Sequence, residues 1–279
     1  APLQWSIPAG AKVWQAPYDE PSQWTPAYER YYEDGVDARQ MQPNENGWAF
    51  PALLELPGDQ GWILLTQACV PRDYCATRMA LDPRRRDGRT TFSVRFPDPG
   101  EGNGVGAVRP TGTVSPWYVV VADDLATIVR STLVTDLNPA CKLQDTSWVK
   151  PGRAAWSWWS DSDSPRSYEK QIAFIDLAAE MGWEYYLVDA NWDLMDGGNV
   201  REMAEYASRK GVGLILWYNS GGSHNIVTEK PRGCMTQRPI RRFEMELLKS
   251  WGIKGIKVDF FQSDKQHMMD LYHGILEDA

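Results

Sequence analysis

The sequence predicts two architectures in one chain: an N-terminal all-β sandwich over residues 1–147, then the first half of a (β/α)₈ TIM barrel over residues 148–279. Up to about residue 145, short apolar runs are separated by glycine and proline, and no long amphipathic helix occurs, which is typical of a sandwich. Beyond that point, helical segments end in glycine shortly before an apolar run. Strand and helix then alternate every roughly 30 to 40 residues, as in a parallel sheet covered by helices.

The strands expected in the first region are short, and we expect its N-terminal part to be incomplete. They are FPALLEL, GWILLTQACV, TTFSVRF, WYVVVAD and IVRSTLV. The segment PDPGEGNGVGAVRPTGTVSP is expected to be a long loop or hairpin tip. Its GxGxG pattern is not followed by a helix, so it does not predict a phosphate-binding loop.

The second region has four expected strands, which are AAWSWW, YYLVDANW, GLILWYN and IKGIKVDFF. Ser167 is a candidate N-cap for the first helix, and Gly182, Gly211 and Gly252 end successive helices. An open doubly wound sheet is the alternative architecture. We favour a barrel because polar and aromatic residues follow each strand, where barrel enzymes build their sites. Four strands are visible where a closed barrel needs eight.

Composition limits the class of partner. A formal net charge of -8 and a pI near 5.0 weigh against nucleic acid or an anionic membrane surface. No stretch reaches the ~18 uncharged apolar residues of a membrane span, and the N-terminus has no signal-peptide pattern. The four cysteines lack metal-ligand spacing, but Cys69 and Cys75 can close a small loop in an oxidising compartment. We therefore expect a periplasmic or secreted protein whose signal peptide is absent from this chain.

Charged residues stand where an apolar strand ends. Lys257 and Asp259 are two positions apart, so they point to the same face, and Asp189 ends the strand two before. Charges in a barrel mouth cost several kcal/mol unless they are paired or bind a ligand. Two carboxylates and an ammonium predict a site for a polyhydroxylated ligand. A neighbouring lysine favours the ionised carboxylate that a nucleophile requires. The alternative is that Asp259 only caps the next turn or pairs with Lys257.

Aromatic residues are abundant, with 14 Trp and 12 Tyr, and flat rings suit either a sugar face or a core. In the run WSWW, Trp156 and Trp158 share one strand face and Trp159 takes the other, so at least one ring should reach the mouth. Packing alone is the alternative. His224, after the third strand, is on the same side, but a structural role is favoured. No Ser/His/Asp arrangement or metal motif appears.

Several segments resemble family 97 of the glycoside hydrolases. They are DTSWVKPGRAAWSWW, YYLVDANW and WGIKGIKVDFFQSDKQ, with AYERYY and FPALLEL earlier in the chain. The resemblance covers nearly the whole chain and implies a β-sandwich followed by a (β/α)₈ catalytic barrel. It also implies an enzyme that hydrolyses α-linked galactosides or glucosides of an oligosaccharide substrate.

The resemblance also implies residue roles. The retaining branch of the family places an aspartate nucleophile on the fourth barrel strand, matching Asp259. The inverting branch carries a glutamate base near the end of the third strand, where this sequence has WYNSGG and no carboxylate. A retaining enzyme uses a second carboxyl group ~5 Å away as acid and then base. By the same resemblance, Lys257 binds sugar hydroxyls, Asp189 orients the sugar, and Trp158 or Trp159 lines the subsite.

Calcium is a further implication. Family members hold a calcium ion through several glutamates, and Glu29 in AYERYY is the matching position. The sequence departs from the family at Gln67, where TEA is usual, and at Tyr118, where PWR is usual. The family's acid glutamate and most calcium ligands lie on later strands. We therefore expect the remaining half of the barrel from a longer chain or a second polypeptide, and no activity from these residues alone.

Three functions follow from these observations. The leading one is a retaining α-glycosidase, with α-galactosidase ahead of α-glucosidase. The second is a carbohydrate-binding protein without catalysis. The third is a structural remnant that binds no ligand.

Overall fold

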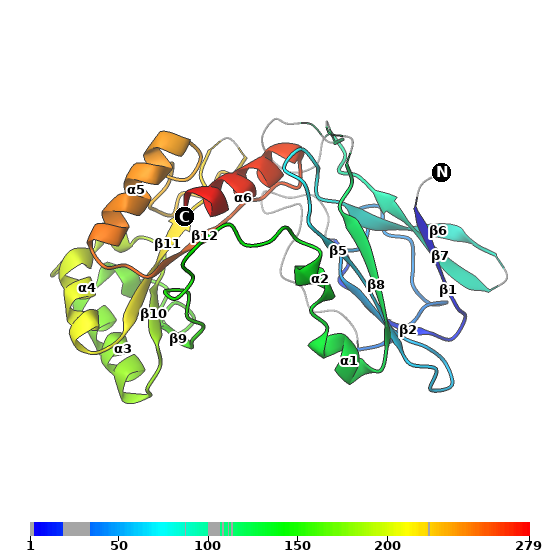
Figure 1. Cartoon of the computed structure of the whole chain (residues 1–279), viewed down its shortest axis with the longest axis horizontal. Coiled ribbons are helices and arrows are strands. Elements are labelled where there is room, and N and C mark those ends of the chain that lie inside the picture. The colour runs from blue at the N-terminus through cyan, green and yellow to red at the C-terminus, as the bar shows by residue number, and fades with distance from the viewer. Residues whose placement is uncertain are drawn as a thin grey trace. The chain divides into compact units, whose positions relative to one another are not determined.

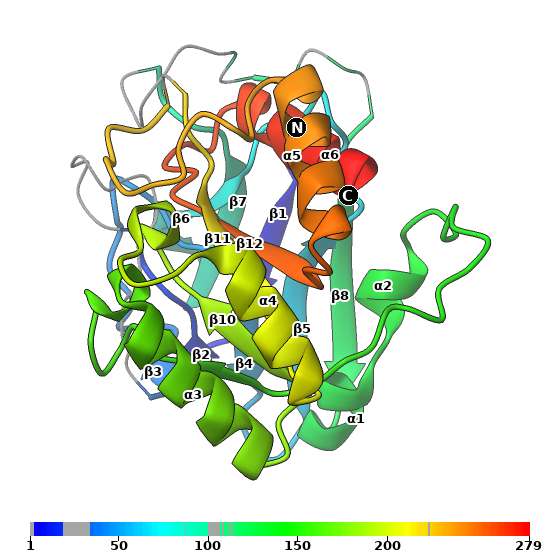
Figure 2. The same cartoon turned by 90° about the vertical axis from the view of Figure 1, so that its left-hand side faces the viewer.

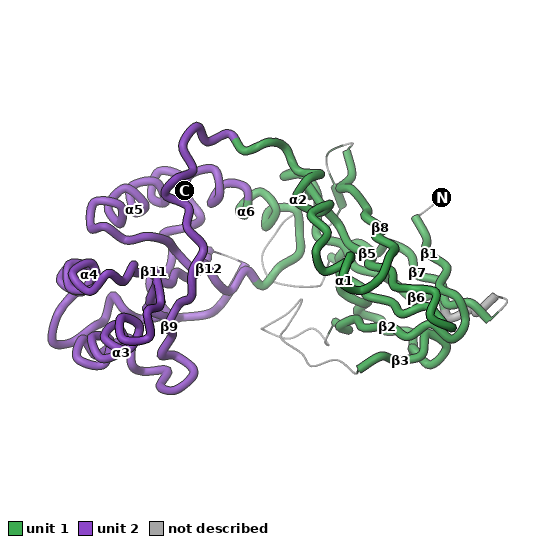
Figure 3. The backbone as a smooth tube through the Cα atoms, turned by 60° about the horizontal axis from the view of Figure 1, so that its bottom comes forward, with its two compact units in different colours: residues 1–141, 262–272 green, residues 142–261, 273–279 purple. Residues whose placement is uncertain are grey.

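The computed structural model describes residues 3–18, 34–86, 88–99, 107, 109, 110, 112, 114–222 and 224–279, with backbone alone for 83–86. The chain divides into two compact units (Figure 3). Unit 1 comprises residues 1–141 and 262–272, and unit 2 comprises residues 142–261 and 273–279. The domain boundary between residues 147 and 148 stays a prediction.

Unit 1 contains two antiparallel sheets (Figure 1). The three-stranded sheet has the order β1 (Gln4–Ile7), β7 (Arg89–Arg95), β6 (Arg78–Arg86). The five-stranded sheet has the order β3 (Val36–Asp37), β2 (Lys12–Trp14), β4 (Ala52–Glu55), β5 (Trp62–Ala68), β8 (Trp117–Asp123). Four of the five apolar runs expected to be strands coincide with β4, β5, β7 and β8.

Apolar side chains from both sheets form one core. Ile7 and Phe92 come from the first sheet, and Val13, Leu54 and Leu65 from the second. Alternate residues of a strand point to one face, so each sheet directs one of its faces toward this core. Two antiparallel sheets around a common core are consistent with the predicted sandwich.

The strand expected over IVRSTLV is wrong. This segment forms two short helices, α1 (Leu125–Arg130) and α2 (Leu133–Asp136). Asp124 begins α1, because its carboxylate accepts a hydrogen bond from the backbone N–H of Thr127 at 2.7 Å. The β-branched residues of IVRSTLV favour a half-buried strand. In α1, however, Val129 is exposed and Ile128 alone is buried, so the segment has no sheet to join and the helix cap determines its conformation.

Unit 2 is built on one parallel sheet, which carries the candidate site. Its order is β12 (Gly255–Asp259), β11 (Gly213–Asn219), β10 (Tyr185–Val188), β9 (Ala154–Trp156), with every pair parallel. The helices α3 (Tyr168–Glu180), α4 (Val200–Arg209) and α5 (Arg238–Ser250) connect successive strands, and α3 and α4 cover β9 to β11 (Figure 2). The 3-10 helices η1 (Ser164–Arg166) and η2 (Trp192–Leu194) follow β9 and β10, and α6 (Gln266–Asp278) follows β12.

The helix boundaries of unit 2 follow local signals in the sequence. Ser167 and Asn199 cap α3 and α4, each accepting a hydrogen bond from the backbone N–H three residues on. Gly182, Gly211 and Gly252 follow the ends of α3, α4 and α5 at φ of 63°, 77° and 79°, the left-handed region that glycine enters readily. The four predicted strands and the helices between them are confirmed.

Two negative findings concern the described residues only. None of their helices is both long and apolar enough to cross a membrane. The cysteines, all of which are described, are free, so Cys69 and Cys75 are not joined. The Cys75 thiol donates to the carbonyl of Ala107 at 3.3 Å, and burial raises its pKa to about 11.

Candidate active site

Three charged side chains meet at the carboxyl ends of the parallel strands. Asp259 is the last residue of β12, Asp189 follows β10, and β11 lies between the two strands. The Lys257 Nζ atom lies 3.2 Å from Asp189 Oδ2 and 3.5 Å from Asp259 Oδ2. One ammonium is therefore shared by two carboxylates, and the structure brings together the three residues singled out in the sequence.

Two indole groups complete this cluster. Trp156 Nε1 donates to Asp189 Oδ2 at 2.7 Å, and Trp217 Nε1 donates to Asp259 Oδ2 at 3.1 Å. The Lys257 ammonium also lies over the Trp156 ring, 4.6 Å from its centroid, a favourable cation–π distance. Trp217 was missed because it looks like an ordinary residue of an apolar run. Aligning the strands in parallel register, which pairs Trp217 with Lys257, was the signal that could have found it.

Each carboxylate also holds the backbone of its own turn. Asp259 Oδ1 accepts from the N–H of Phe260 at 2.8 Å, and Asp189 Oδ1 accepts from the N–H of Ala190 at 2.8 Å. Phe260 has a φ of 61°, a left-handed conformation that costs a residue with a Cβ about 1–2 kcal/mol. Asp259 therefore caps the following turn with one oxygen, as the alternative interpretation proposed, and presents the other to the cluster.

Burial separates the two carboxylates. The Asp189 side chain is 5% exposed, whereas Lys257 and Asp259 are 33% and 38% exposed. Asp189 is thus enclosed by its three donors, while Asp259 remains accessible to a small molecule. The cluster carries two negative charges and one positive charge.

The exposed tryptophans Trp158 and Trp159 pack beside Trp156, which belongs to the cluster. The rings of Trp158 and Trp159 are both centred 5.9 Å from the Trp156 ring, at interplanar angles of 12° and 51°. Trp158 is 42% exposed and Trp159 81% exposed. The expected alternation of faces is wrong here, because β9 ends at Trp156 and the N–H of Ser160 turns back to the carbonyl of Ser157 at 3.1 Å.

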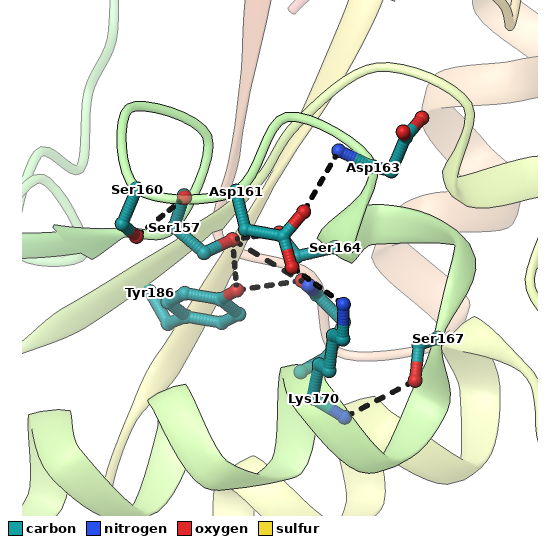
Figure 4. A network of polar contacts seen from close by, with 9 residues as sticks. Ser157, Ser160, Asp161, Asp163, Ser164, Ser167, Lys170 and Tyr186 are labelled. Carbon is teal, nitrogen blue, oxygen red and sulfur yellow. Dashed lines mark hydrogen bonds and ion pairs between the residues drawn. The ribbon is translucent and has the colours of Figure 1, made fainter.

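A buried chain of hydroxyl groups fixes the turn that carries these tryptophans (Figure 4). Ser164 Oγ donates to Ser157 Oγ at 2.8 Å, Ser157 Oγ lies 3.0 Å from the Tyr186 hydroxyl, and Tyr186 donates to Gln171 Oε1 at 2.6 Å. All four residues are fully buried, and burial raises the pKa of Tyr186. Because each donor has an acceptor, the chain ties the turn after β9 to β10 and α3.

His224 lies inside the loop that follows β11. It is almost fully buried, and its Nε2 lies 2.8 Å from Ser220 Oγ. The structure thus places His224 in a structural hydrogen-bond network, in line with the favoured interpretation.

The predicted calcium ligand Glu29 lies outside the described residues. Among the residues that the structure does describe, no group of three or more His, Cys, Asp or Glu side chains could hold a metal ion. The calcium site therefore stays a prediction, and we assign calcium no chemical step.

The two departures from the family pattern lie opposite each other in unit 1. Gln67 on β5 pairs with Tyr118 on β8. Gln67 Nε2 donates to Thr77 Oγ1 at 2.8 Å, and the Tyr118 hydroxyl lies 3.4 Å from that of Tyr74. Neutral hydrogen-bonding groups thus occupy both positions.

The fold and the cluster define the class of protein: a β-sheet domain followed by an α/β domain whose polar site lies at the carboxyl ends of parallel strands. Two family models match the chain, "Glycosyl-hydrolase 97 N-terminal" over residues 2–139 and "Glycoside hydrolase 97" over residues 148–279. Together they match nearly all of it. The chain belongs to glycoside hydrolase family 97.

Two curated relatives carry names that specify a reaction. A "Probable retaining alpha-galactosidase" of Streptomyces bingchenggensis is 29% identical over 268 residues, which are 91% of this chain and 38% of that protein. A "Retaining alpha-galactosidase" of Bacteroides thetaiotaomicron is 32% identical over 173 residues, 55% of this chain and 24% of that protein. The chain thus spans well under half the length of the relatives it matches.

Two solved structures are similar to the chain over nearly its whole length. A "beta-arabinopyranosidase" is 34% identical with a TM-score of 0.86, over 99% of this chain and 44% of that one. A family 97 enzyme of Pseudoalteromonas sp. strain K8, bound to the oligosaccharide panose, is 19% identical with a TM-score of 0.66, over 97% of this chain and 44% of that one. The second likeness shows the fold alone.

Proposed function

We propose that the protein to which this chain belongs is a retaining α-glycosidase that uses Asp259 as its nucleophile. The observation that carries the proposal is the accessible Asp259 carboxylate at the end of β12, with Lys257 Nζ at 3.5 Å and Trp217 Nε1 at 3.1 Å. Both donors stabilise the negative charge of Asp259 and restrict its rotation. Such a group can attack an anomeric carbon.

The chemistry has two steps. An oxygen of Asp259 forms a bond to the anomeric carbon while the bond to the leaving oxygen breaks, and a second carboxyl group protonates that oxygen. That group then removes a proton from the water that releases the sugar. Asp189 is a poor candidate for the second group, because its oxygens already accept from Trp156, Lys257 and Ala190. Its proposed role is to orient Lys257 and, through it, the sugar.

The proposal extends to the architecture. The four parallel strands of unit 2 and their helices are the repeating unit of a (β/α)₈ barrel, and their polar residues lie at the carboxyl ends, where such barrels bind substrates. By resemblance to the family, the acid and base carboxyl group belongs to a later strand. Calcium and a periplasmic or secreted location stay predictions.

The names of the relatives favour a sugar of galacto configuration. A β-arabinopyranoside of the L series has the ring of an α-D-galactopyranoside without the carbon outside the ring, and for that series the two named activities share one arrangement of ring hydroxyls. An oligosaccharide ending in such a ring is the proposed substrate. The corresponding α-glucoside is the alternative, and a carbohydrate-binding protein without catalysis is the second candidate.

The test compares hydrolysis of nitrophenyl α-galactoside, β-L-arabinopyranoside and α-glucoside by the full-length protein. Asp259→Asn should lower kcat/KM by about 10³-fold or more, since it removes the nucleophile. The matched control is Asp163→Asn, an exposed aspartate of the same unit that should leave the rate unchanged. With the α-galactoside, proton NMR should show the α anomer of galactose first.

Two results would contradict the proposal. An Asp259→Asn protein that retains the rate of the unmodified protein excludes the assigned nucleophile. A full-length protein that binds galactose but hydrolyses none of the three glycosides is a carbohydrate-binding protein instead.

A further inference from the structure

Two polar side chains of the loop after β11 bind the carbonyl group of Phe260, the residue that follows Asp259. Ser220 Oγ donates to the carbonyl oxygen of Phe260 at 3.0 Å, and Asn225 Nδ2 donates to the same oxygen at 2.7 Å. The backbone N–H of Ser220 also donates to the carbonyl of Asp259 at 2.9 Å. Both carbonyl groups at the end of β12 are thus bound by residues of a neighbouring loop.

The donors and acceptors of this network determine its directions. Because the single hydroxyl proton of Ser220 goes to Phe260, Ser220 Oγ must accept from His224 Nε2 at 2.8 Å, and Asn225 Nδ2 lies 3.2 Å from the same oxygen. Asn225 Nδ2 also donates to Asn219 Oδ1 at 2.9 Å. Turning the amide of Asn225 around would bring its oxygen against two acceptors, so its nitrogen must face Phe260.

Further hydrogen bonds hold the backbone of the loop that contains Asn225. Asn219 Nδ2 donates to the carbonyl groups of Val227 and Glu229, both at 3.1 Å, and Arg232 Nη2 donates to the carbonyl of Asn225 at 2.8 Å. Asn225 is buried, yet its Oδ1 has no hydrogen-bond partner among the described residues. An amide in this position therefore acts through its NH₂ group, since its oxygen gains nothing there.

The two bound carbonyl groups lie on either side of the Phe260 backbone, and the conformation of Phe260 controls Asp259. Phe260 holds a φ of 61°, and its N–H binds Asp259 Oδ1 at 2.8 Å. Its ring packs edge-on against Trp217, whose Nε1 binds Asp259 Oδ2. A rotation of the Phe260 backbone would therefore move the donors of both carboxylate oxygens.

We infer that Asn225, assisted by Ser220, is a positioning residue that holds the Asp259 carboxylate in the orientation needed for attack. The inference rests on the proposed function. Asn225 makes no hydrogen bond to the carboxylate, and it acts through Phe260, the left-handed residue next to Asp259. Nucleophilic attack is sensitive to displacements of about 1 Å, so a loss of this restraint lowers the chemical step more than it lowers sugar binding.

The experiment uses the full-length protein with 4-nitrophenyl α-galactoside. Asn225→Ala should lower kcat by about 10- to 100-fold with KM and the inhibition constant of galactose changed less than about threefold. Ser220→Ala keeps one of the two donors and should lower kcat by a smaller factor. The matched control is Asn199→Ala, which also removes an Asn hydrogen bond to the backbone but at the start of α4, and should leave kcat unchanged.

Rescue by azide separates positioning from general damage to the pocket. In Asp259→Ala, azide replaces the carboxylate, bonds to the anomeric carbon as 4-nitrophenolate leaves, and gives the β-glycosyl azide. This rate should be the same with and without Asn225→Ala, because no carboxylate remains to be positioned. A parallel fall of the azide rate would show that Asn225 only maintains the pocket and would overturn the inference.

Other outcomes are equally decisive. An unchanged kcat in Asn225→Ala overturns the inference while leaving Asp259 as nucleophile. If Asn225→Ala does not fold, an unchanged kcat in Ser220→Ala overturns it in the same way, and a reduced kcat with normal azide rescue supports it. An active Asp259→Ala protein would instead overturn the proposed function.

Discussion

Unit 2 contains two groups of basic and acidic side chains that differ in burial and in charge balance. Arg241 on α5 donates to Asp278 Oδ2 through Nη2 at 2.5 Å and Nε at 2.9 Å, and Arg238 donates to Asp278 Oδ1 at 3.1 Å. The side chains of Arg241 and Asp278 are only 5% and 2% exposed. At the strand ends, one lysine serves two carboxylates and a third of its surface is exposed.

The difference lies in which charge is in excess. At Asp278, two guanidinium groups satisfy both oxygens of one carboxylate and join α5 to the end of α6. We call Arg241 and Asp278 the closed pair. At Lys257, two carboxylates share one cation, so the charge of the accessible Asp259 is incompletely neutralised. We call this group the open cluster. A closed buried pair stabilises the fold, whereas an open cluster retains charge for a ligand.

The largest expected effect breaks the closed pair. Arg241→Met leaves the Asp278 carboxylate buried beside the more distant Arg238, and should lower the free energy of unfolding by about 3–5 kcal/mol. Urea titration followed by circular dichroism measures it. The matched control is Arg242→Met on the exposed side of α5, with an expected change within about 0.5 kcal/mol. Equal losses of unfolding free energy in Arg241→Met and Arg242→Met would show that burial of the Arg241–Asp278 pair does not cause the effect.

The open cluster should respond in activity instead. Lys257→Met removes the cation that lies between Asp189 and Asp259 and should lower kcat/KM by about 10²- to 10³-fold, the effect of losing one electrostatic donor in an active site. Its free energy of unfolding should change less than that of Arg241→Met, because the cluster is partly solvated. Lys254→Met, an exposed lysine just before β12, is the control. If Lys257→Met lowers the free energy of unfolding by more than the free energy that corresponds to its loss of kcat/KM, the contrast between the open cluster and the closed pair is wrong.

The closed pair should also depend on pH. Burial alone would raise the pKa of Asp278, but the hydrogen bonds from Arg241 and Arg238 outweigh it and hold the pKa below its ordinary value. Folding therefore favours the ionised form, so this stabilisation is present above the ordinary pKa of about 4 and is lost as the pH falls through the folded-state pKa.

This dependence is measurable as a difference between variants. The gap in urea midpoint between the unmodified protein and Asp278→Asn should be largest near neutral pH and should shrink progressively below about pH 4. Asp163→Asn should show no such gap. A gap that stays constant down to pH 3 would contradict the role assigned to the ionised carboxylate.

The smallest effect is expected at the exposed rings. Trp159→Ala should raise KM by about threefold to tenfold with little change in kcat, since a ring that only contacts sugar contributes about 1 kcal/mol. Trp148→Ala, an exposed tryptophan outside the cluster, is the control. Equal effects of the two substitutions would remove the subsite role predicted for Trp159.

The features that local patterns could predict are those that depend on one strand or helix at a time. The two-residue spacing of Lys257 and Asp259 gave their common face, and Ser167 and Gly182 gave the limits of α3. The open cluster followed because polar residues after parallel strands meet at one edge of a sheet. The contact of Trp217 with Asp259 depends on register between strands, which no single segment contains.

The closed pair was not predictable for the same reason. Arg241 and Asp278 lie on separate helices, and each resembles a solvated helix residue in the sequence. IVRSTLV shows the opposite failure, because its composition favours a strand while its position gives it no sheet to join. The local roles of the hydroxyl and amide groups of Ser220 and Asn225 became visible only with the left-handed turn at Phe260.

The excess carboxylate described at Lys257 has a consequence for the choice of inhibitors. A protonated iminosugar brings the missing positive charge into the cluster and should bind more tightly than the neutral sugar of the same shape. A uronic acid brings another anion and should be rejected. Selectivity between these analogues would thus measure the local charge balance without any substitution in the protein.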